Sequence, residues 1–123
     1  MKDQNGIEYE ECVVGNVIGP HEWGKQHEIK YGTKYFSSGT KVYCIFMYGG
    51  MGHERIRVFG KARQSSRMID VVTSETYIVN RRVQKVYDKK VIRFLKKYAA
   101  VNTKDFVEVV RQNELVRELY KIS

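Results

Sequence analysis

The sequence lacks the features that mark several broad classes of protein. Its 123 residues include one proline and no run of about 20 apolar residues, the length that a membrane-spanning helix needs. No apolar signal core occurs in its first residues, MKDQNGIEYEE. We therefore expect a cytoplasmic protein with no membrane partner.

Cysteine is scarce, and its two occurrences do not indicate redox or metal chemistry. Cys12 and Cys44 each lie in an apolar run typical of a strand, so we expect two reduced thiols in the core. The three histidines and two cysteines show no spacing typical of a zinc site. The sequence therefore predicts neither a metal nor a cofactor.

A recognisable catalytic set is also missing. No serine has the context of a nucleophile elbow, and neither cysteine has a basic neighbour that would activate it. Asp70 and Glu75 do not form an evident carboxylate pair. The GGMG segment, residues 49–52, lacks the spacing of a phosphate loop and leads into a predicted strand. We therefore predict that the protein is not an enzyme and has no catalytic residue.

Positive charge is the most informative feature that is present. The formal net charge is +8 at pH 7, and residues 81–97 hold eight basic residues against one acid, or +7. A concentrated positive field raises the local concentration of anions, whether nucleic acid, nucleotide or acidic protein. We therefore expect an anionic partner.

Hydrophobic patterning predicts a single α+β domain over residues 1–123. Strand-like runs separated by turns fill about residues 11–87, which predicts a small antiparallel β-sheet or open barrel. Two helices are predicted to follow, at about residues 88–100 and 103–122. The run TKVYCIFMY, residues 40–48, is apolar on both faces, so it is predicted to be a central strand.

The two predicted helices differ in the placement of their apolar residues. The first has Asp88 as a predicted N-cap and one apolar stripe, formed by Val91, Phe94, Leu95 and Tyr98. In the second, apolar residues spread more widely than packing on a small sheet requires. We therefore predict a homodimer or higher homo-oligomer through the C-terminal helices, with Val110 in the contact.

The strand predicted after the GGMG turn offers the most specific candidate site. Arg55 and Arg57 alternate with apolar residues and share one predicted face, which is either a binding surface or a solvated one. Arginine matches phosphate bidentately, and aromatic rings stack on bases. Gly60 is predicted to mark a bend or bulge. The predicted ligand-binding residues are Arg57, Arg55, Tyr48, Phe59, Gly50, Gly52, His53 and Asn80.

In its layout the chain resembles the phage Thoeris anti-defence family, the sponges that sequester cyclic ADP-ribose signals. The resemblance rests on YGGMGHERIRVFG (residues 48–60) and on the helix pair at residues 88–122. It implies a non-enzymatic homo-oligomer in the cytoplasm of the host cell. Such a protein binds a small anionic nucleotide, a cyclic ADP-ribose isomer or a cyclic oligonucleotide, and blocks antiviral defence by removing the signal.

Two other functions remain open from the residues alone. The net charge and the basic segment also suit a small nucleic-acid-binding barrel, whose affinity would depend strongly on salt. A toxin-immunity protein or antitoxin would instead act through a protein–protein contact, for which the long connection at residues 21–39 is the candidate.

Overall fold

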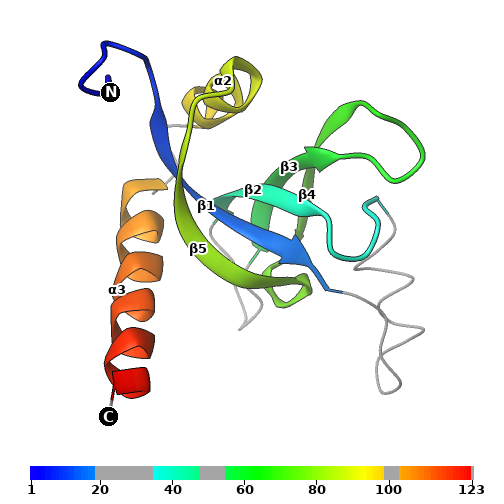
Figure 1. The fold of residues 1–123 in the computed structure, drawn as a ribbon. Helices are drawn as coiled ribbons and strands as arrows, with labels where there is room; N and C mark the ends of the chain where they lie inside the picture. The colour runs from blue at the N-terminus through cyan, green and yellow to red at the C-terminus, as the bar shows by residue number, and fades with distance from the viewer. Residues whose placement is uncertain (19–34, 48–54, 99–102, 123) are drawn as a thin grey trace.

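The computed structural model describes residues 1–18, 35–47, 55–98 and 103–122. It has the predicted α+β architecture, a five-stranded antiparallel sheet followed by two helices (Figure 1). The elements are β1 (Glu10–Val17), β2 (Lys41–Met47), β3 (Arg55–Lys61), β4 (Met68–Ser74), the 3-10 turn η2 (Glu75–Tyr77), β5 (Ile78–Val86), α2 (Lys89–Lys97) and α3 (Thr103–Ile122).

The sheet has the strand order β4-β3-β2-β1-β5. Its first four strands form a meander, and β5 returns to pair with β1. The chain passes from β4 at one edge to β5 at the other through only three residues of η2, which requires a strongly curved sheet.

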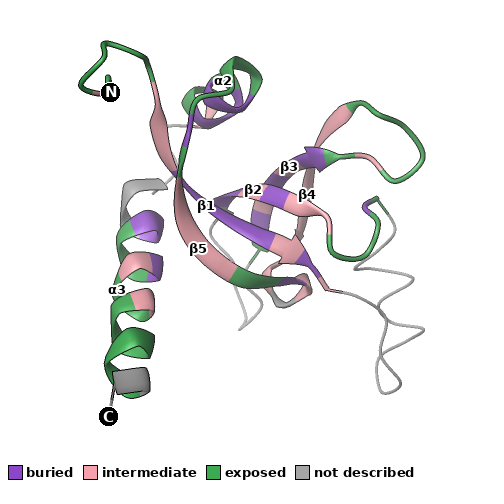
Figure 2. Cartoon of the chain, viewed as in Figure 1, coloured by how far each residue is buried: buried purple, intermediate pink, exposed green. Residues whose placement is uncertain are grey.

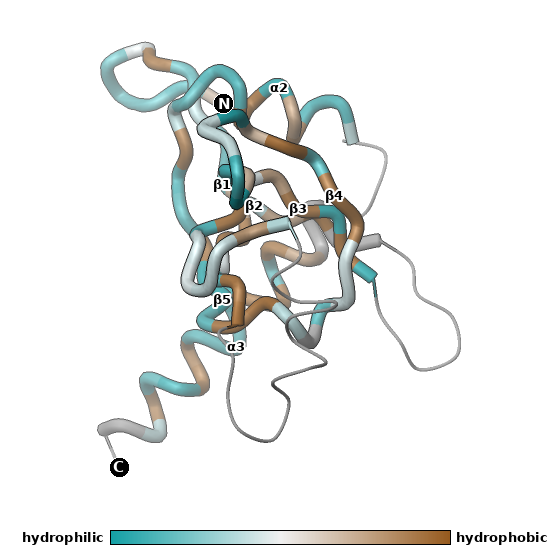
Figure 3. The backbone as a smooth tube through the Cα atoms, turned by 90° about the vertical axis from the view of Figure 1, so that its right-hand side faces the viewer, coloured by the Kyte–Doolittle hydropathy of each residue, from teal (hydrophilic) through white to brown (hydrophobic). Residues whose placement is uncertain are grey.

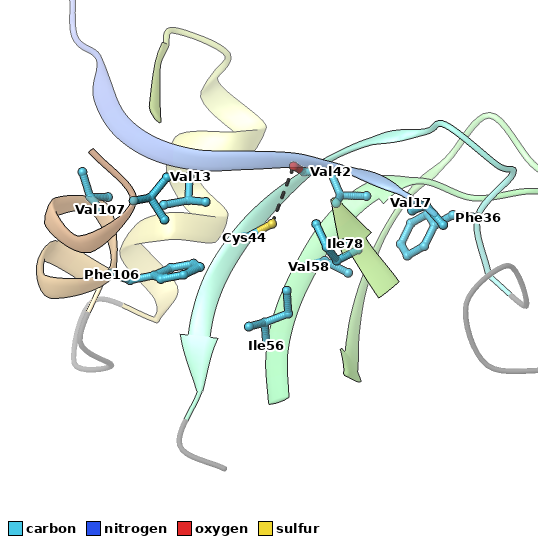
Figure 4. Close-up of a cluster of buried hydrophobic side chains, with 11 residues drawn as sticks. Val13, Val17, Phe36, Val42, Cys44, Ile56, Val58, Ile78, Phe106 and Val107 are labelled. Carbon is cyan, nitrogen blue, oxygen red and sulfur yellow. Dashed lines mark hydrogen bonds between the residues drawn. The ribbon is translucent and has the colours of Figure 1, made fainter. Parts of the chain in front are cut away.

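Both faces of the central strands are buried, because alternate residues of β1, β2 and β3 enter two separate hydrophobic clusters. Figure 2 shows buried residues, in purple, along these strands. One face packs against the first turns of α3 (Figure 4), and the other packs against α2. The first cluster contains Val13, Val17, Phe36, Val42, Cys44, Ile56, Val58, Ile78, Phe106, Val107 and Val110. The second contains Cys12, Val14, Ile45, Val86, Val91, Phe94 and Leu95. The predicted central position of β2 is therefore confirmed.

The start and the apolar stripe of α2 are as predicted. The Asp88 side chain caps the helix by accepting hydrogen bonds from the backbone N–H groups of Lys90 (2.8 Å) and Val91 (3.3 Å). The stripe faces the second cluster, so the lysines and the arginine of α2 face outward. In the part of the chain that the structure describes, neither helix is long and apolar enough to cross a lipid bilayer.

The predicted bulge at Gly60 is absent, and β5 runs from Ile78 to Val86 with an irregularity opposite β1. Asn80 lies at that irregularity with φ 56°, a conformation that asparagine tolerates better than most residues. At Gly60 the register of β3 continues unshifted with both neighbours, so there is no bulge. A Cβ at Gly60 would lie 2.7 Å from the Val42 Cγ1 atom, so this glycine permits close packing.

Both cysteines are free, buried thiols, as predicted. Cys12 belongs to one hydrophobic cluster and Cys44 to the other, so they lie on opposite faces of the sheet. Burial raises the pKa of the Cys12 thiol from 9.0 to about 12, and it also raises the pKa of Cys44. Neither thiol is therefore a nucleophile in the folded protein.

These thiols should make the fold less stable at high pH. Above pH 9 the thiols of the unfolded chain ionise while those of the folded chain stay protonated, so the free energy of unfolding falls as pH rises. The slope is at most about 1.4 kcal/mol per pH unit for each thiol. Urea titrations from pH 8 to pH 11 measure it, with the Cys12→Ala/Cys44→Ala protein as control. Equal slopes in the two proteins would contradict this assignment.

Candidate functional site

The candidate site is a cluster of three side chains on the α2 side of the sheet, which we call the Arg57 cluster. The Arg57 Nη1 atom donates to Asp70 Oδ1 at 3.1 Å, and the hydroxyl of Tyr98 donates to Asp70 Oδ2 at 2.7 Å. The Arg57 guanidinium also lies over the Tyr98 ring, 4.6 Å from its centroid. One carboxylate thus joins an arginine of β3 to the residue that ends α2.

Sheet register brings these groups together. Phe59 of β3 lies opposite Asp70 of β4, and Arg57 lies two residues earlier on the same face. The side chains of Arg57 and Asp70 are each about a quarter exposed (24% and 23%). The cluster therefore lies at the border between the packed sheet and the solvent.

Stacked aromatic rings anchor α2 beside the cluster. The ring of Phe94 stacks on Phe59, with centroids 4.9 Å apart and planes inclined by 15°. The same ring meets Tyr98 edge-on at 5.5 Å. Phe59, which the sequence assigns to base stacking, therefore has one face covered by the protein itself.

Positive charge predominates around the cluster. Arg55 is exposed on the same face of β3, and the Lys97 ammonium lies 5.3 Å from the centroid of the Tyr98 ring. With Arg57, these residues give three positive charges against the one carboxylate of Asp70. Among the residues that the structure describes, none accepts a hydrogen bond from the buried Nε–H group of Arg57. Such an arrangement attracts an anion that is small enough to approach a half-buried arginine.

The structure brings together only some of the predicted site residues. Arg55, Arg57 and Phe59 share the α2 side of β3. Asn80 lies on β5, and two strands separate it from β3 in the sheet order. The remaining four predicted residues, Tyr48, Gly50, Gly52 and His53, lie outside the described residues.

Sequence reasoning missed Asp70 and Tyr98. Asp70 is polar in an otherwise apolar stretch of strand, MIDVV, and this was the available signal that it has a specific partner. Tyr98 was counted as part of the apolar stripe, although its hydroxyl needs a hydrogen-bond partner when it is half-buried.

A second charged surface lies on the outward side of α2. Lys96 binds Glu8 of the N-terminal segment at 2.5 Å; this hydrogen bond lowers the pKa of Glu8 and raises that of Lys96. Four further basic residues of α2 are exposed, and the structure gives them no ion pair with any carboxylate that it describes. These are Lys89, Lys90, Arg93 and Lys97, and we call them the basic face of α2.

No metal centre is formed by the described residues, among which no three His, Cys, Asp or Glu side chains are grouped to hold an ion. Comparisons with protein-family models, with curated proteins and with solved structures found no match for the chain.

Proposed function

We propose that this protein is a non-enzymatic binding protein that sequesters a small cyclic nucleotide of the cyclic ADP-ribose type in the cytoplasm and so blocks antiviral defence. The observation that carries the proposal is the Arg57 cluster. It holds an arginine in a fixed direction by one ion pair and one ring contact, and it leaves the arginine partly exposed.

The chemistry of the cluster suits a diphosphate ligand. Arg57 uses Nη1 for Asp70, which leaves other guanidinium N–H groups for an incoming phosphate. Arg55 provides a second, exposed guanidinium on the same face. The Tyr98 ring fixes the plane of Arg57, so that less side-chain entropy is lost on binding than with a free arginine.

Nucleic-acid binding is the second candidate, and the basic face of α2 favours it. Its residues recur along one side of the helix, and no acidic residue occurs within α2. A phosphate backbone that follows this row would bind with an affinity that falls steeply as salt rises. Titration of cyclic ADP-ribose and of a labelled oligonucleotide at two salt concentrations separates the two functions.

If the nucleotide binds at the Arg57 cluster, the basic face of α2 should act mainly on the association rate. Lys89→Glu combined with Arg93→Glu changes the charge by −4 at exposed positions, so we expect severalfold slower association and little change in dissociation. Stopped-flow binding measures both rates, with Lys89→Gln/Arg93→Gln as an intermediate control. A faster dissociation with an unchanged association rate would place these side chains in the binding site.

A further inference from the structure

The solvent side of α3 carries a cluster of exposed apolar side chains, which is unusual for a helix on the surface of a small domain. Phe106, Val107 and Val110 attach its first turns to the sheet, and Figure 3 shows the rest of the helix leading away from it. Five apolar side chains of α3 do not pack on the sheet and are about half to three quarters exposed. They are Val109 (54%), Leu115 (60%), Val116 (48%), Leu119 (68%) and Tyr120 (78%). Clustered exposed apolar residues mark interaction surfaces.

The helical period places these side chains on one side. At about 100° per residue, Val109, Val116 and Tyr120 fall within roughly 40° of one another. Leu119 lies about 60° and Leu115 about 100° from Val116, so the five side chains span about 140° of the helix. The buried residues of α3 lie on the far side. Among the described side chains of α3, only Glu108 carries a charge within the apolar sector. We call this sector the outer face of α3.

The flanks of α3 are tied to the sheet by polar contacts. The Glu114 carboxylate accepts a hydrogen bond from the backbone N–H of Val83 at 3.0 Å, and Arg111 binds Glu11 of β1. An open groove of about 370 Å³ follows this side, lined by Arg111, Glu114, Leu115, Arg117 and Glu118. These contacts fix the rotation of the helix, so its outer face cannot turn inward to bury itself on the sheet.

The charge distribution indicates which partner binds the outer face of α3. The chain has a net charge of +8, and α2 carries five basic residues and no acid, so the surface around α2 would repel a second copy. By contrast, α3 carries four basic and four acidic residues and is neutral. A two-fold interface sets the same surface against itself, which favours a neutral face with balanced flanks. A membrane-surface helix would instead have Lys and Arg dominating its polar side.

We propose that the outer face of α3 binds the outer face of α3 in a second copy of this chain, with the two helices antiparallel. In an antiparallel pair the two helix dipoles point in opposite directions, and the two basic sheets lie at opposite ends of the dimer. Self-association was predicted from the sequence through both C-terminal helices. The positive charge of α2 limits the predicted self-association to α3. Val110 was predicted to be in the contact, but it is only 4% exposed and belongs to the core.

A variant at Leu119 tests the contact without disturbing the fold, because this side chain is 68% exposed. Leu119→Glu buries an unpaired charge at each side of the interface, so we expect the dimer dissociation constant to rise by at least about a hundredfold. Sedimentation velocity at micromolar concentration should show a dimer for the wild type and a monomer for the variant. The control is Gln64→Glu, an equal change of charge at an exposed turn, which should remain a dimer.

Orientation is tested by disulfide cross-linking in a background where Cys12 and Cys44 are alanine. In an antiparallel pair that crosses near Leu115, Val109→Cys of one copy lies near Tyr120→Cys of the other. A mixture of the two variants should therefore cross-link faster than either variant alone. A monomeric wild type, a dimeric Leu119→Glu protein, or faster cross-linking of each variant with itself would overturn the proposal. None of these outcomes depends on the identity of the nucleotide.

Discussion

Replacing Phe94 by alanine should lower the free energy of unfolding by about 3–5 kcal/mol, the range for truncating a buried phenylalanine. The side chain is 4% exposed, stacks on Phe59 and contacts Tyr98. Its loss leaves a cavity under α2 and frees the residue that ends the helix. Chemical denaturation measures the effect.

Phe94→Leu is the matched control, because it keeps an apolar side chain and fills much of the cavity. We expect this variant to lose roughly half as much stability as the alanine variant. Both variants should also weaken nucleotide binding, because Tyr98 holds Asp70 and stacks on Arg57. A Phe94→Ala protein with the stability of the wild type would show that α2 does not depend on this contact.

Replacing Arg57 by alanine should weaken binding of cyclic ADP-ribose by at least about tenfold, because it removes a charge-assisted contact worth roughly 1.5–3 kcal/mol. Arg57→Lys should restore only part of the affinity, since an ammonium cannot reproduce the planar guanidinium. Stability should fall as well, because Asp70 loses its ion pair. Calorimetry measures the affinity of each variant.

Asp70→Asn separates the two roles of Arg57. This variant removes the same ion pair but leaves the guanidinium in place. The asparagine amide oxygen can still accept a hydrogen bond from Arg57 Nη1 and hold the guanidinium, while the negative charge that repels a phosphate is removed. If Arg57 binds phosphate, Asp70→Asn should therefore keep or increase the affinity while Arg57→Ala loses it. If Arg57 only supports the fold, the two variants should weaken binding to a similar extent. That second result would remove Arg57 from the binding site.

The fold could be predicted because its signals are local. The two apolar faces of residues 41–47 are visible in the sequence, and the cap of α2 depends on Asp88 and the two N–H groups that follow it closely. Self-association of α3 was inferred from the same local pattern. That pattern placed Val110 in the contact between copies, although Val110 packs on the sheet, because the sequence does not show which apolar stripe of the helix faces the sheet.

The Arg57 cluster could not be predicted, because its contacts join distant parts of the chain. Arg57 meets Asp70 across 13 residues and Asp70 meets Tyr98 across 28, so their partnership depends on strand register and on where α2 lies. Asn80 was predicted to bind the ligand. The structure shows a backbone reason for this residue, since its φ of 56° accommodates the irregularity in β5.

Mass spectrometry of the small molecules released when the purified protein is heated tests most directly whether the protein captures a small cyclic nucleotide. The protein is incubated with an extract of cells in which the defence signal has been produced, then washed and denatured. We expect the wild type to release a cyclic ADP-ribose isomer or a cyclic oligonucleotide, and Arg57→Ala to release at least about tenfold less. Release of no nucleotide by the wild type, or of equal amounts by both proteins, would overturn the proposed function of the Arg57 cluster.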